Sequence, residues 1–566
     1  MRKITKEEIE GYECKHVVYM ENNNGELSDM LFVKELIHLK DKTTVPSTRI
    51  IKNFERPYWV TKPAARNHEF KKQFERLENL DAYKSTQIKL TRSIARTLRI
   101  GWVPDQRVMS RSQYLYGTDV DTRAIIKNIY KTKFNNLTTI NAVAVCDLEA
   151  DVVYGHEKVL SGSLTYKDRV VIVVTREFLG TIPDAENQIQ EKFEYYLGEH
   201  KRTRGIKLEV VIVDNELGVV LELVKRMHAW QPDFVAFWNM AYDIPKMLSI
   251  LDRYGVDPAS VWCDPSVPPE YRIAKWAPGA SMKITASGRK MALGVAERWN
   301  TFYIAAGFYV IDAMCVYQKI RVGAGKEPSY GLDAILTKEL GIRKLKFEEA
   351  SHLIGIGWHQ FMQQRYKLEY LIYNIFDCIS IELLDEKNMD LASKISMLSE
   401  CSDYSQFPSQ PRRTCNQLHF YALQNEGHVI GSTSDNMELE LDKYVTSTEG
   451  WIVTLPTQQV VDSGLKCIEE FPELSTKIRL HVADIDVTGA YPTGEDILNI
   501  STETNYRELS KIEGCTEWQR RMVGINLTGG AVNATELCRL MYRAPTYAQL
   551  GRKFGDSMGL SAKSID

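Results

Sequence analysis

Four carboxylates and one phenol lie in three short segments whose spacing suits metal chemistry. The segments are Cys146-Asp147-Leu148-Glu149, Trp238-Asn239-Met240-Ala241-Tyr242-Asp243 and Tyr373-Asn374-Ile375-Phe376-Asp377. Asp147 and Glu149 are two residues apart at the end of an apolar run, so both should project to the same side of a buried strand. Such oxygen ligands suit Mg²⁺ or Mn²⁺, and two ions about 3.5–4 Å apart can stabilise the attacking and leaving oxygens of a phosphodiester. The pattern predicts metal-dependent hydrolysis of a nucleic-acid strand. An isolated Asp-x-Glu pair is commonly just a solvated strand end, so the inference depends on the three segments occurring together in this order.

The chain between these segments alternates strand and helix patterns. Apolar runs at 170–174 and 208–213 predict strands, and the periodicity over 218–230 and 244–254 predicts helices. We therefore expect a mixed α/β domain over residues 139–390, with the acids at strand ends and on helices, where side chains from different elements converge.

The order and flanks of the three segments resemble the 3′→5′ proofreading exonuclease of family B DNA polymerases, particularly the T-even bacteriophage type. Further similar segments lie at 233–239, 310–312, 317–319 and 329–333. The resemblance implies an RNase H-like fold with two metal ions at the exonuclease site. It assigns the metal ligands as Asp147, Glu149, Asp243 and Asp377, Tyr373 as the residue that orients the attacking water, and Asn239 as a DNA contact. The family usually places four residues between Asn and Asp of the second segment, whereas Asn239 and Asp243 have three between them.

A second segment similar to family B polymerases lies at 484–493 and continues into residues 499–504. It reads Asp484-Ile485-Asp486-Val487-Thr488-Gly489-Ala490-Tyr491-Pro492-Thr493. It resembles the first polymerase motif, in which an Asp five residues before Tyr-Pro binds the two catalytic metals, and this assigns Asp486. The resemblance implies that the nucleotide-binding residues are Thr488, Gly489, Ala490 and Tyr491. Gly489 and Ala490 replace the family's Ser-Leu, so nucleotide selection should differ. A lone Asp that ends a strand is the alternative interpretation.

The second and third polymerase motifs, Lys followed by Asn-Ser-x-Tyr-Gly and Tyr-Gly-Asp-Thr-Asp-Ser, do not occur in the sequence. We therefore expect the N-terminal subunit or fragment of a split or truncated replicative DNA polymerase, with proofreading exonuclease activity and one catalytic Asp for the polymerase site. The alternatives are a free-standing 3′→5′ exonuclease and a noncatalytic DNA-binding scaffold.

The expected architecture is an α/β and α+β multidomain chain. Its regions are an N-terminal α+β domain (1–138), the RNase H-like exonuclease domain (139–390), a linker that returns to the N-terminal or palm region (391–438), and the beginning of a family B palm (439–566). The polar, proline-containing residues 401–413 mark the linker.

Two basic elements are expected to face DNA. The alternating pattern over 282–310 predicts an extended β-hairpin with Arg289 and Lys290 at its tip. A helical stripe of Lys and Arg could engage phosphates, with an ordinary solvated face as the alternative; it consists of Lys89, Arg92, Arg96 and Arg99. The expected partners are primer-template and single-stranded DNA, a dNTP bound jointly with a second polypeptide that carries the fingers, the rest of the palm and the thumb, and a sliding clamp reached through that polypeptide.

The bulk composition is that of an ordinary globular chain. With 44% hydrophobic and 26% charged residues and a net charge of −3, it has no global basic field, so DNA contacts must be local. Its 10 cysteines form no Cys-x-x-Cys pair, which favours reduced thiols in a cytoplasmic protein, in the bacterial host if phage-encoded. No run approaches the roughly 20 apolar residues of a membrane span, and no membrane contact is expected.

Overall fold

The computed structural model describes residues 4–433 apart from 23–26, 69–70, 102–104, 135–136, 156, 199–204 and 285–288. Beyond these it describes only Thr493, Ile497 and four short strands. Residues 1–67 and 72–432 form one compact unit, and 68–71 with 433–566 form a second. The architecture is mixed α/β, as the sequence predicts.

A six-stranded sheet forms the centre of the first unit. Its order is β11 (Lys207–Val213), β10 (Arg169–Thr175), β9 (Val159–Tyr166), β8 (Val143–Ala150), β12 (Phe234–Phe237) and β17 (Tyr309–Asp312). Only β9 runs against the other five strands of this sheet. Parallel strands need crossover helices, which cover both faces of such a sheet.

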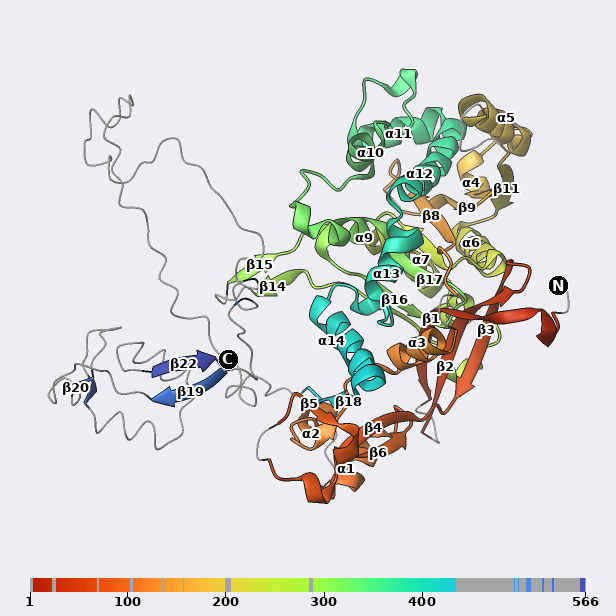
Figure 1. The fold of residues 1–566 in the computed structure, drawn as a ribbon. Coiled ribbons are helices and arrows are strands. Elements are labelled where there is room, and N and C mark those ends of the chain that lie inside the picture. The colour runs from red at the N-terminus through yellow and green to blue at the C-terminus, as the bar shows by residue number, and fades with distance from the viewer. Residues whose placement is uncertain are drawn as a thin grey trace, which may run out of the picture. The chain divides into compact units, whose positions relative to one another are not determined.

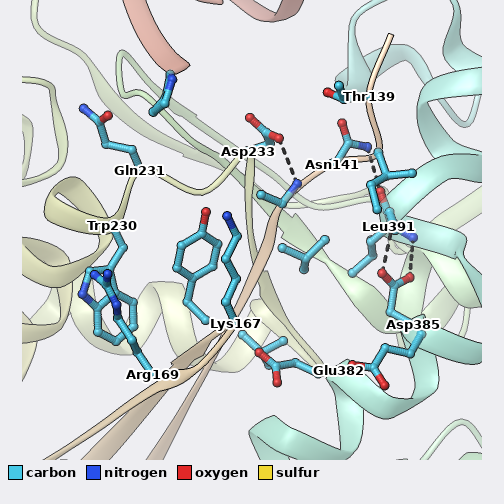
Figure 2. A pocket seen from close by; sticks show the side chains of 18 of the residues that line it. Thr139, Asn141, Lys167, Arg169, Trp230, Gln231, Asp233, Glu382, Asp385 and Leu391 are labelled. Atoms are coloured by element: carbon cyan, nitrogen blue, oxygen red, sulfur yellow. Dashed lines mark hydrogen bonds between the residues drawn. The ribbon is translucent and has the colours of Figure 1, made fainter. Parts of the chain in front are cut away.

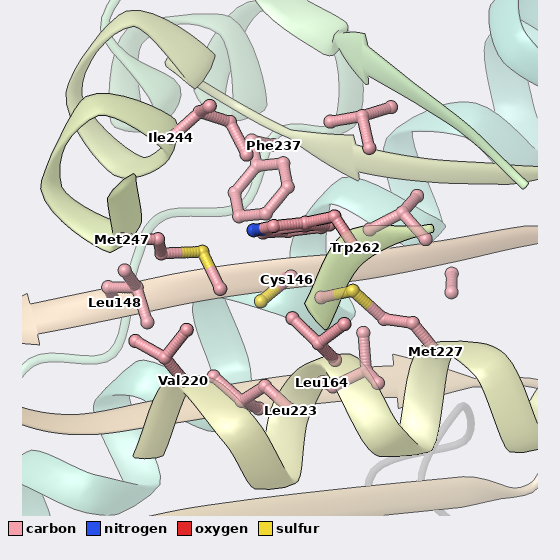
Figure 3. Close-up of a cluster of buried hydrophobic side chains, with 14 of the residues drawn as sticks. Cys146, Leu148, Leu164, Val220, Leu223, Met227, Phe237, Ile244, Met247 and Trp262 are labelled. Carbon is pink, nitrogen blue, oxygen red and sulfur yellow. The ribbon is translucent and has the colours of Figure 1, made fainter. Parts of the chain in front are cut away.

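One face of the sheet packs on α6 (Glu216–Trp230), α7 (Met240–Arg253) and α8 (Pro258–Trp262). Cys146 and Leu148 of β8 point into this core, together with Met247 and Trp262 (Figure 3). The alternate β8 residues therefore face the other side, where Val145 packs in a separate cluster.

Long helix α12 (Lys367–Asn388) covers that second face and lies along β8 and β9 (Figure 1). It packs in two clusters with α5 (Ala185–Leu197), α9 (Ala313–Ile320) and α10 (Leu332–Leu340). The result is three layers, helix, sheet and helix, and β8 is sandwiched between α7 and α12. Both of these helices can thus present side chains to the end of one strand.

Two predicted helices begin earlier in the structure than the apolar pattern indicates. Helix α6 begins at Glu216 because Asn215 accepts a hydrogen bond from the Gly218 N–H at 3.1 Å. Helix α7 begins at Met240 and contains Pro245, which lacks the N–H that would bond to the Ala241 carbonyl. Asp243 consequently lies in the first turn of α7.

The N-terminal region consists of two antiparallel three-stranded sheets and three helices. One sheet has the order β1 (Ile9–Asn22), β2 (Ser28–Leu39) and β3 (Thr44–Lys52), and the other β6 (Leu80–Ser85), β4 (Arg56–Thr61) and β7 (Leu115–Tyr116). The helices are α1 (Leu90–Leu98), α2 (Gln106–Met109) and α3 (Thr122–Lys133). The strand predicted around residues 16–20 is therefore much longer, and α3 packs on it.

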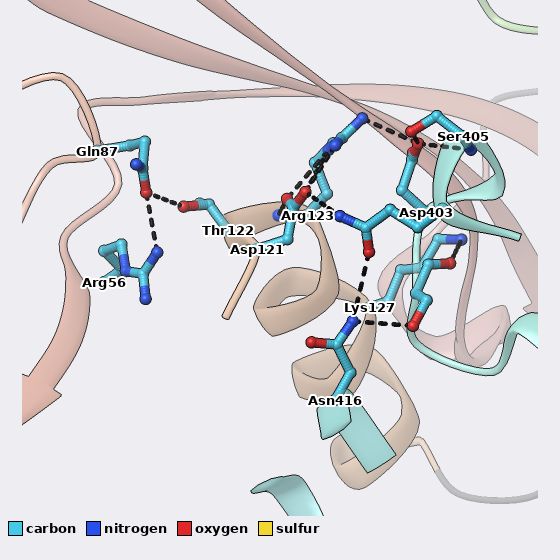
Figure 4. Close-up of polar contacts among 11 residues, drawn as sticks. Arg56, Gln87, Asp121, Thr122, Arg123, Lys127, Asp403, Ser405 and Asn416 are labelled. Atoms are coloured by element: carbon cyan, nitrogen blue, oxygen red, sulfur yellow. Dashed lines mark hydrogen bonds and ion pairs between the residues drawn. The ribbon is translucent and has the colours of Figure 1, made fainter. Parts of the chain in front are cut away.

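The stretch 401–413 is packed, whereas its polar composition predicts a linker. Cys401, Tyr404 and Phe407 are buried, and α14 (Gln410–Tyr421) begins inside the stretch. The Arg123 guanidinium lies 2.9 Å from Asp403, and the Lys127 ammonium donates to the Ser402 carbonyl at 3.0 Å (Figure 4). The polar residues are there because two buried cations of α3 need partners.

The chain then returns to the N-terminal region through β18. Strand β18 (His428–Ile430) pairs with β5 (Phe74–Arg76) in antiparallel register. The remaining elements of this unit are α4 (Arg176–Leu179), α11 (Gly355–Arg365), α13 (Ile395–Ser399) and two strand pairs, β13 (Ala274–Ala277) with β16 (Thr301–Ile304) and β14 (Met282–Ile284) with β15 (Lys290–Ala292).

In the second unit, β19 (Asn505–Leu509) pairs with β22 (Leu560–Ser564), and β20 (Met522–Val523) with β21 (Val532–Asn533). Within the described parts of the chain, no helix combines the length and apolar character that a membrane crossing needs.

Candidate metal centre

Three of the predicted ligands meet at the end of strand β8. Asp147, Glu149 and Asp377 each offer one carboxylate oxygen, and these oxygens lie within 4.8 Å of one another. Asp147 and Glu149 project from β8 toward α12, and Asp377 comes from the middle of that helix. The period of two along the strand places both β8 carboxylates on this face, as predicted.

Helix α12 holds the β8 carboxylates through two hydrogen bonds. Asn374 Nδ2 donates to Asp147 Oδ2 at 2.7 Å, and the Tyr370 hydroxyl donates to Glu149 Oε2 at 2.5 Å. Tyr370, Asn374 and Asp377 recur at spacings of four and three, which places them on one face of the helix. Tyr370 was not predicted, and Asn374 appeared in a motif without a role. The helical spacing of both from Asp377 is the signal that identifies them.

Asp243 enters from the opposite helical layer, through the first turn of α7. Its side chain is buried, and its pKa is raised well above its usual range by burial and by the nearby charge of Asp147. It is not one of the three residues whose oxygens cluster most tightly. The negative charge of Glu149 also contributes to this shift of the Asp243 pKa.

The carboxylate cluster carries more negative charge than the nearby cations balance. Burial and the Asp377 carboxylate raise the pKa of Asp147 to about 7, and burial and Asp147 raise the pKa of Glu149 to about 8. Burial also raises the pKa of Asp377, although the Lys344 ammonium opposes this shift. Carboxyl groups this close cannot all ionise without a compensating cation.

Lys344 is a cation that the structure adds to the predicted set. Its Nζ donates to the Asp377 carboxylate at 2.5 Å and to the Tyr373 hydroxyl at 2.9 Å. Burial alone would lower the pKa of Lys344, but Asp377 and Tyr373 together raise it. The residue lies 33 positions before Asp377, in a loop with Arg343 and Lys346, and nothing in the sequence distinguishes it from them.

The predicted water-orienting residue, Tyr373, lies at the candidate metal centre, where its hydroxyl accepts the hydrogen bond from Lys344. Its ring is stacked on Tyr370, with centroids 6.0 Å apart and planes at 9°, and its centroid lies 4.9 Å from that of Trp358. This packing fixes the ring and leaves the hydroxyl beside Asp377.

The residues predicted to contact DNA lie on three different elements: a turn, a hairpin and a helix. Asn239 lies in the turn before α7, where its carbonyl accepts the Tyr242 N–H, and its buried Oδ1 has no hydrogen-bond partner among the described residues. The extended hairpin predicted over 282–310 is wrong in extent, because β14 pairs with β15 over 282–284 and 290–292, whereas β16 pairs with β13. Arg289 and Lys290 are exposed, and Lys290 is the first residue of β15. The basic stripe lies exposed on and beside α1; it comprises Lys89, Arg92, Arg96 and Arg99.

The predicted polymerase residues lie outside the described part of the chain. They are Asp486, Thr488, Gly489, Ala490 and Tyr491.

The donor set fits a hard divalent cation. All four predicted ligands offer oxygen, and Oδ1 of Asp243 and Oδ1 of Asp377 are buried without a hydrogen-bond partner in the described residues. Buried carboxylate oxygens normally have partners, so unsatisfied ones beside other carboxylates are suited to an ion. The charge, the oxygen donors and the unsatisfied oxygens therefore fit a divalent metal ion.

A cavity of about 830 Å³ lies near the other end of β8 and includes none of these carboxylates (Figure 2). Asp233 accepts the Ala142 N–H at 2.9 Å, and Asp385 accepts the Leu391 and Ala392 N–H groups at 2.6 and 3.0 Å. These acids satisfy backbone donors, which is a structural role.

No protein-family model matches this sequence, and a search of curated proteins finds no match.

Proposed function

We propose that this chain is a metal-dependent 3′→5′ exonuclease of the RNase H-like type and the N-terminal part of a family B DNA polymerase. One observation carries the nuclease assignment. Carboxylates from two of the motifs, Asp147 and Glu149 of the first and Asp377 of the third, converge at one place although more than 220 residues separate the two motifs along the chain.

The sheet supports the same proposal. A strand that carries two carboxylates, one antiparallel neighbour and helices on both faces are compatible with the RNase H-like fold that the resemblance implies. Parallel sheets of this kind place their active residues at strand ends.

The chain's own residues have separable roles in strand hydrolysis. Asp147, Glu149, Asp243 and Asp377 would hold the two ions, and Asn374 and Tyr370 would fix the orientation of the first two. Bound Mg²⁺ or Mn²⁺ would supply Lewis-acid stabilisation of the attacking water and the leaving oxygen. The Tyr373 hydroxyl would orient that water, and the Lys344 ammonium would neutralise charge developing on the phosphate.

The polymerase part of the proposal depends on the sequence resemblance of residues 484–504. It assigns one catalytic carboxylate, Asp486, to nucleotidyl transfer. Two-metal transfer requires carboxylates from more than one strand, so the rest of that site would come from residues outside this sequence.

The direct test is degradation of single-stranded DNA. With a 5′-labelled oligonucleotide and Mg²⁺, the purified chain should produce a ladder that shortens from the 3′ end and disappears with EDTA. The Asp147→Ala/Glu149→Ala variant should lose this activity while it keeps its fold, as circular dichroism would show. Asp168→Ala, an exposed carboxylate outside the centre, is the matched control. Undiminished nuclease activity in the double variant would refute the site.

A further inference from the structure

A cavity of about 730 Å³ lies on the carboxyl-end side of the sheet, separate from the metal ligands. Its walls come from the residues around β9 and the end of β10, the first turn of α6, the end of α7 and the junction between α11 and α12. None of the four predicted metal ligands lines it. Cavities of roughly 300–1,000 Å³ suit ligands the size of a nucleotide.

Gln363 connects this cavity to the metal centre. It lines the cavity, and its Nε2 donates to the Tyr370 hydroxyl at 3.2 Å and to the Ala150 carbonyl at 2.8 Å. Tyr370 in turn donates to Glu149, so two hydrogen bonds separate a cavity wall from a metal ligand. A strand that reaches the metal centre therefore passes close to the cavity.

The cavity carries two exposed aromatic rings. Tyr154 is 78% exposed and Tyr254 43% exposed, and among the described residues neither ring stacks on another. Exposed tyrosines at a cavity mouth provide faces on which nucleic-acid bases stack, independently of base identity.

Cations line the same cavity, and one of them is unpaired. Arg365, exposed at the end of α11, makes no hydrogen bond or ion pair with any described residue. Lys158 lies 3.6 Å from Glu177, and Lys367 donates to the Phe178 carbonyl at 2.6 Å.

The cavity's carboxylates already have partners. Glu216 lies 2.5 Å from Arg253 and accepts the Val159 N–H at 3.1 Å, and Asp151 accepts the N–H groups of Val153 and Tyr154. Arg365 therefore offers donors that no described residue accepts, and the Lys367 ammonium is bonded to a carbonyl and not to a carboxylate, so both positive charges could pair with a phosphate.

We infer that this cavity is a nucleotide subsite, which binds a nucleotide of the single strand other than the one being cleaved. Its base stacks on Tyr154 and Tyr254, and its phosphate pairs with Arg365. This inference rests on the proposed exonuclease function, because it takes the substrate to be a single strand whose 3′ end lies at the metal centre.

Binding can be measured without catalysis. In the Asp147→Ala/Glu149→Ala background, fluorescence anisotropy of 5′-fluorescein-labelled (dT)12 should report a dissociation constant. Tyr154→Ala/Tyr254→Ala should raise it about 10-fold or more, since one base stack contributes about 1–3 kcal/mol. Arg365→Ala should raise it a few-fold and reduce the salt dependence by about one phosphate contact. Tyr195→Ala and Lys207→Ala, exposed residues outside the cavity, should leave it unchanged.

In the active chain, the same cavity variants should raise KM and leave kcat nearly unchanged, because the metal centre is intact. Unchanged (dT)12 affinity in both cavity variants would overturn the inference. Competition with dTMP distinguishes a strand subsite from a product site. If the variants weaken only dTMP binding, the strand assignment is wrong. The anisotropy experiment uses an inactivated chain, so its outcome does not depend on nuclease activity. Absence of DNA degradation by the unmodified chain would refute the proposed function and not this inference.

Discussion

The Lys344 ammonium lies 2.5 Å from the Asp377 carboxylate and 2.9 Å from the Tyr373 hydroxyl, so a single half-buried cation contacts both predicted functional residues of α12. It reduces the repulsion among the clustered carboxylates and joins the metal ligand to the predicted water-orienting phenol. The contribution of Lys344 to stability can be measured separately from its contribution to catalysis.

Replacing Lys344 with Met should destabilise the metal-free protein, but by less than the about 3–5 kcal/mol that breaking a fully buried ion pair costs, because the lysine is partly exposed. Saturating Mn²⁺ should recover part of this loss, because a divalent cation restores the missing positive charge. Thermal unfolding with and without Mn²⁺ measures the difference. Lys338→Met, which removes a more exposed ion pair with Glu327, is the control. Equal destabilisation of Lys344→Met with and without metal would contradict the charge-balancing role.

Tyr373→Phe should lower kcat by about 10²-fold or less, and much less than loss of the β8 carboxylates, because the metal ligands remain. Single-turnover degradation of labelled single-stranded DNA measures the chemical step. Tyr370→Phe is an informative comparison, since its hydroxyl bonds to Glu149 but not to Lys344. A Tyr373→Phe loss as large as that of the Asp147→Ala/Glu149→Ala variant would assign the phenol a different role.

Metal binding should release protons at neutral pH. The pKa values of Asp147 and Glu149 are raised to about 7 and about 8, so below these values a metal must displace protons. Apparent Mn²⁺ affinity should therefore rise by about ten-fold per pH unit for each proton released, and level off above pH 8. Titration calorimetry in two buffers of different ionisation enthalpy counts the protons. Affinity that is independent of pH from 6 to 9 would show that the carboxylates are already ionised.

The same groups should make the metal-free protein less stable as pH rises. Their pKa values are raised from 3.8 and 4.5 to about 7 and about 8, so between these limits the folded state retains protons that the unfolded state loses. Their contribution is fully present below about pH 4 and is lost as pH rises through about 8. Asp147→Asn/Glu149→Gln should remove this dependence and, at pH 8 without metal, raise stability by at least about 1 kcal/mol. A parallel pH profile for the variant and the original chain would contradict this linkage.

Primer extension should require a second polypeptide. The chain alone should degrade a primer without extending it. Adding a polypeptide that carries the missing polymerase motifs should restore synthesis. Asp486→Ala should eliminate that synthesis and spare the nuclease, because the two sites use different carboxylates. Extension by the isolated chain, or synthesis by the complex that contains Asp486→Ala, would refute the split-polymerase assignment.

Local periodicity explains which parts of the site were predictable. Asp147 and Glu149 share a face because a strand repeats every two residues, and Tyr373 and Asp377 share one because a helix repeats every 3.6 residues. The convergence of β8 and α12 followed from resemblance to a known family, since no local pattern specifies that contact. Lys344 was missed because its position depends on a loop, where neither periodicity applies.

Helix and domain boundaries were harder to predict for a related reason. The apolar pattern locates the buried part of a helix, so it placed α7 four residues late and missed the turn that carries Asp243. Residues 401–413 are polar because they satisfy buried cations, and from sequence alone this composition is indistinguishable from that of an exposed linker.

The bonds from α3 to residues 402 and 403 also affect how the protein is made. Lys127 and its partner Ser402 are 275 residues apart, so a ribosome working at about 5–20 residues per second delivers the partner roughly 15 to 55 s after the lysine. Strand β5 likewise has no partner strand until β18 has been synthesised. During this interval Lys127 lacks the Ser402 carbonyl, Arg123 has Asp121 but not Asp403, and a sheet edge lacks its final strand. The first 138 residues synthesised alone should therefore fold poorly and depend on chaperones, although they look like a self-contained domain in the sequence.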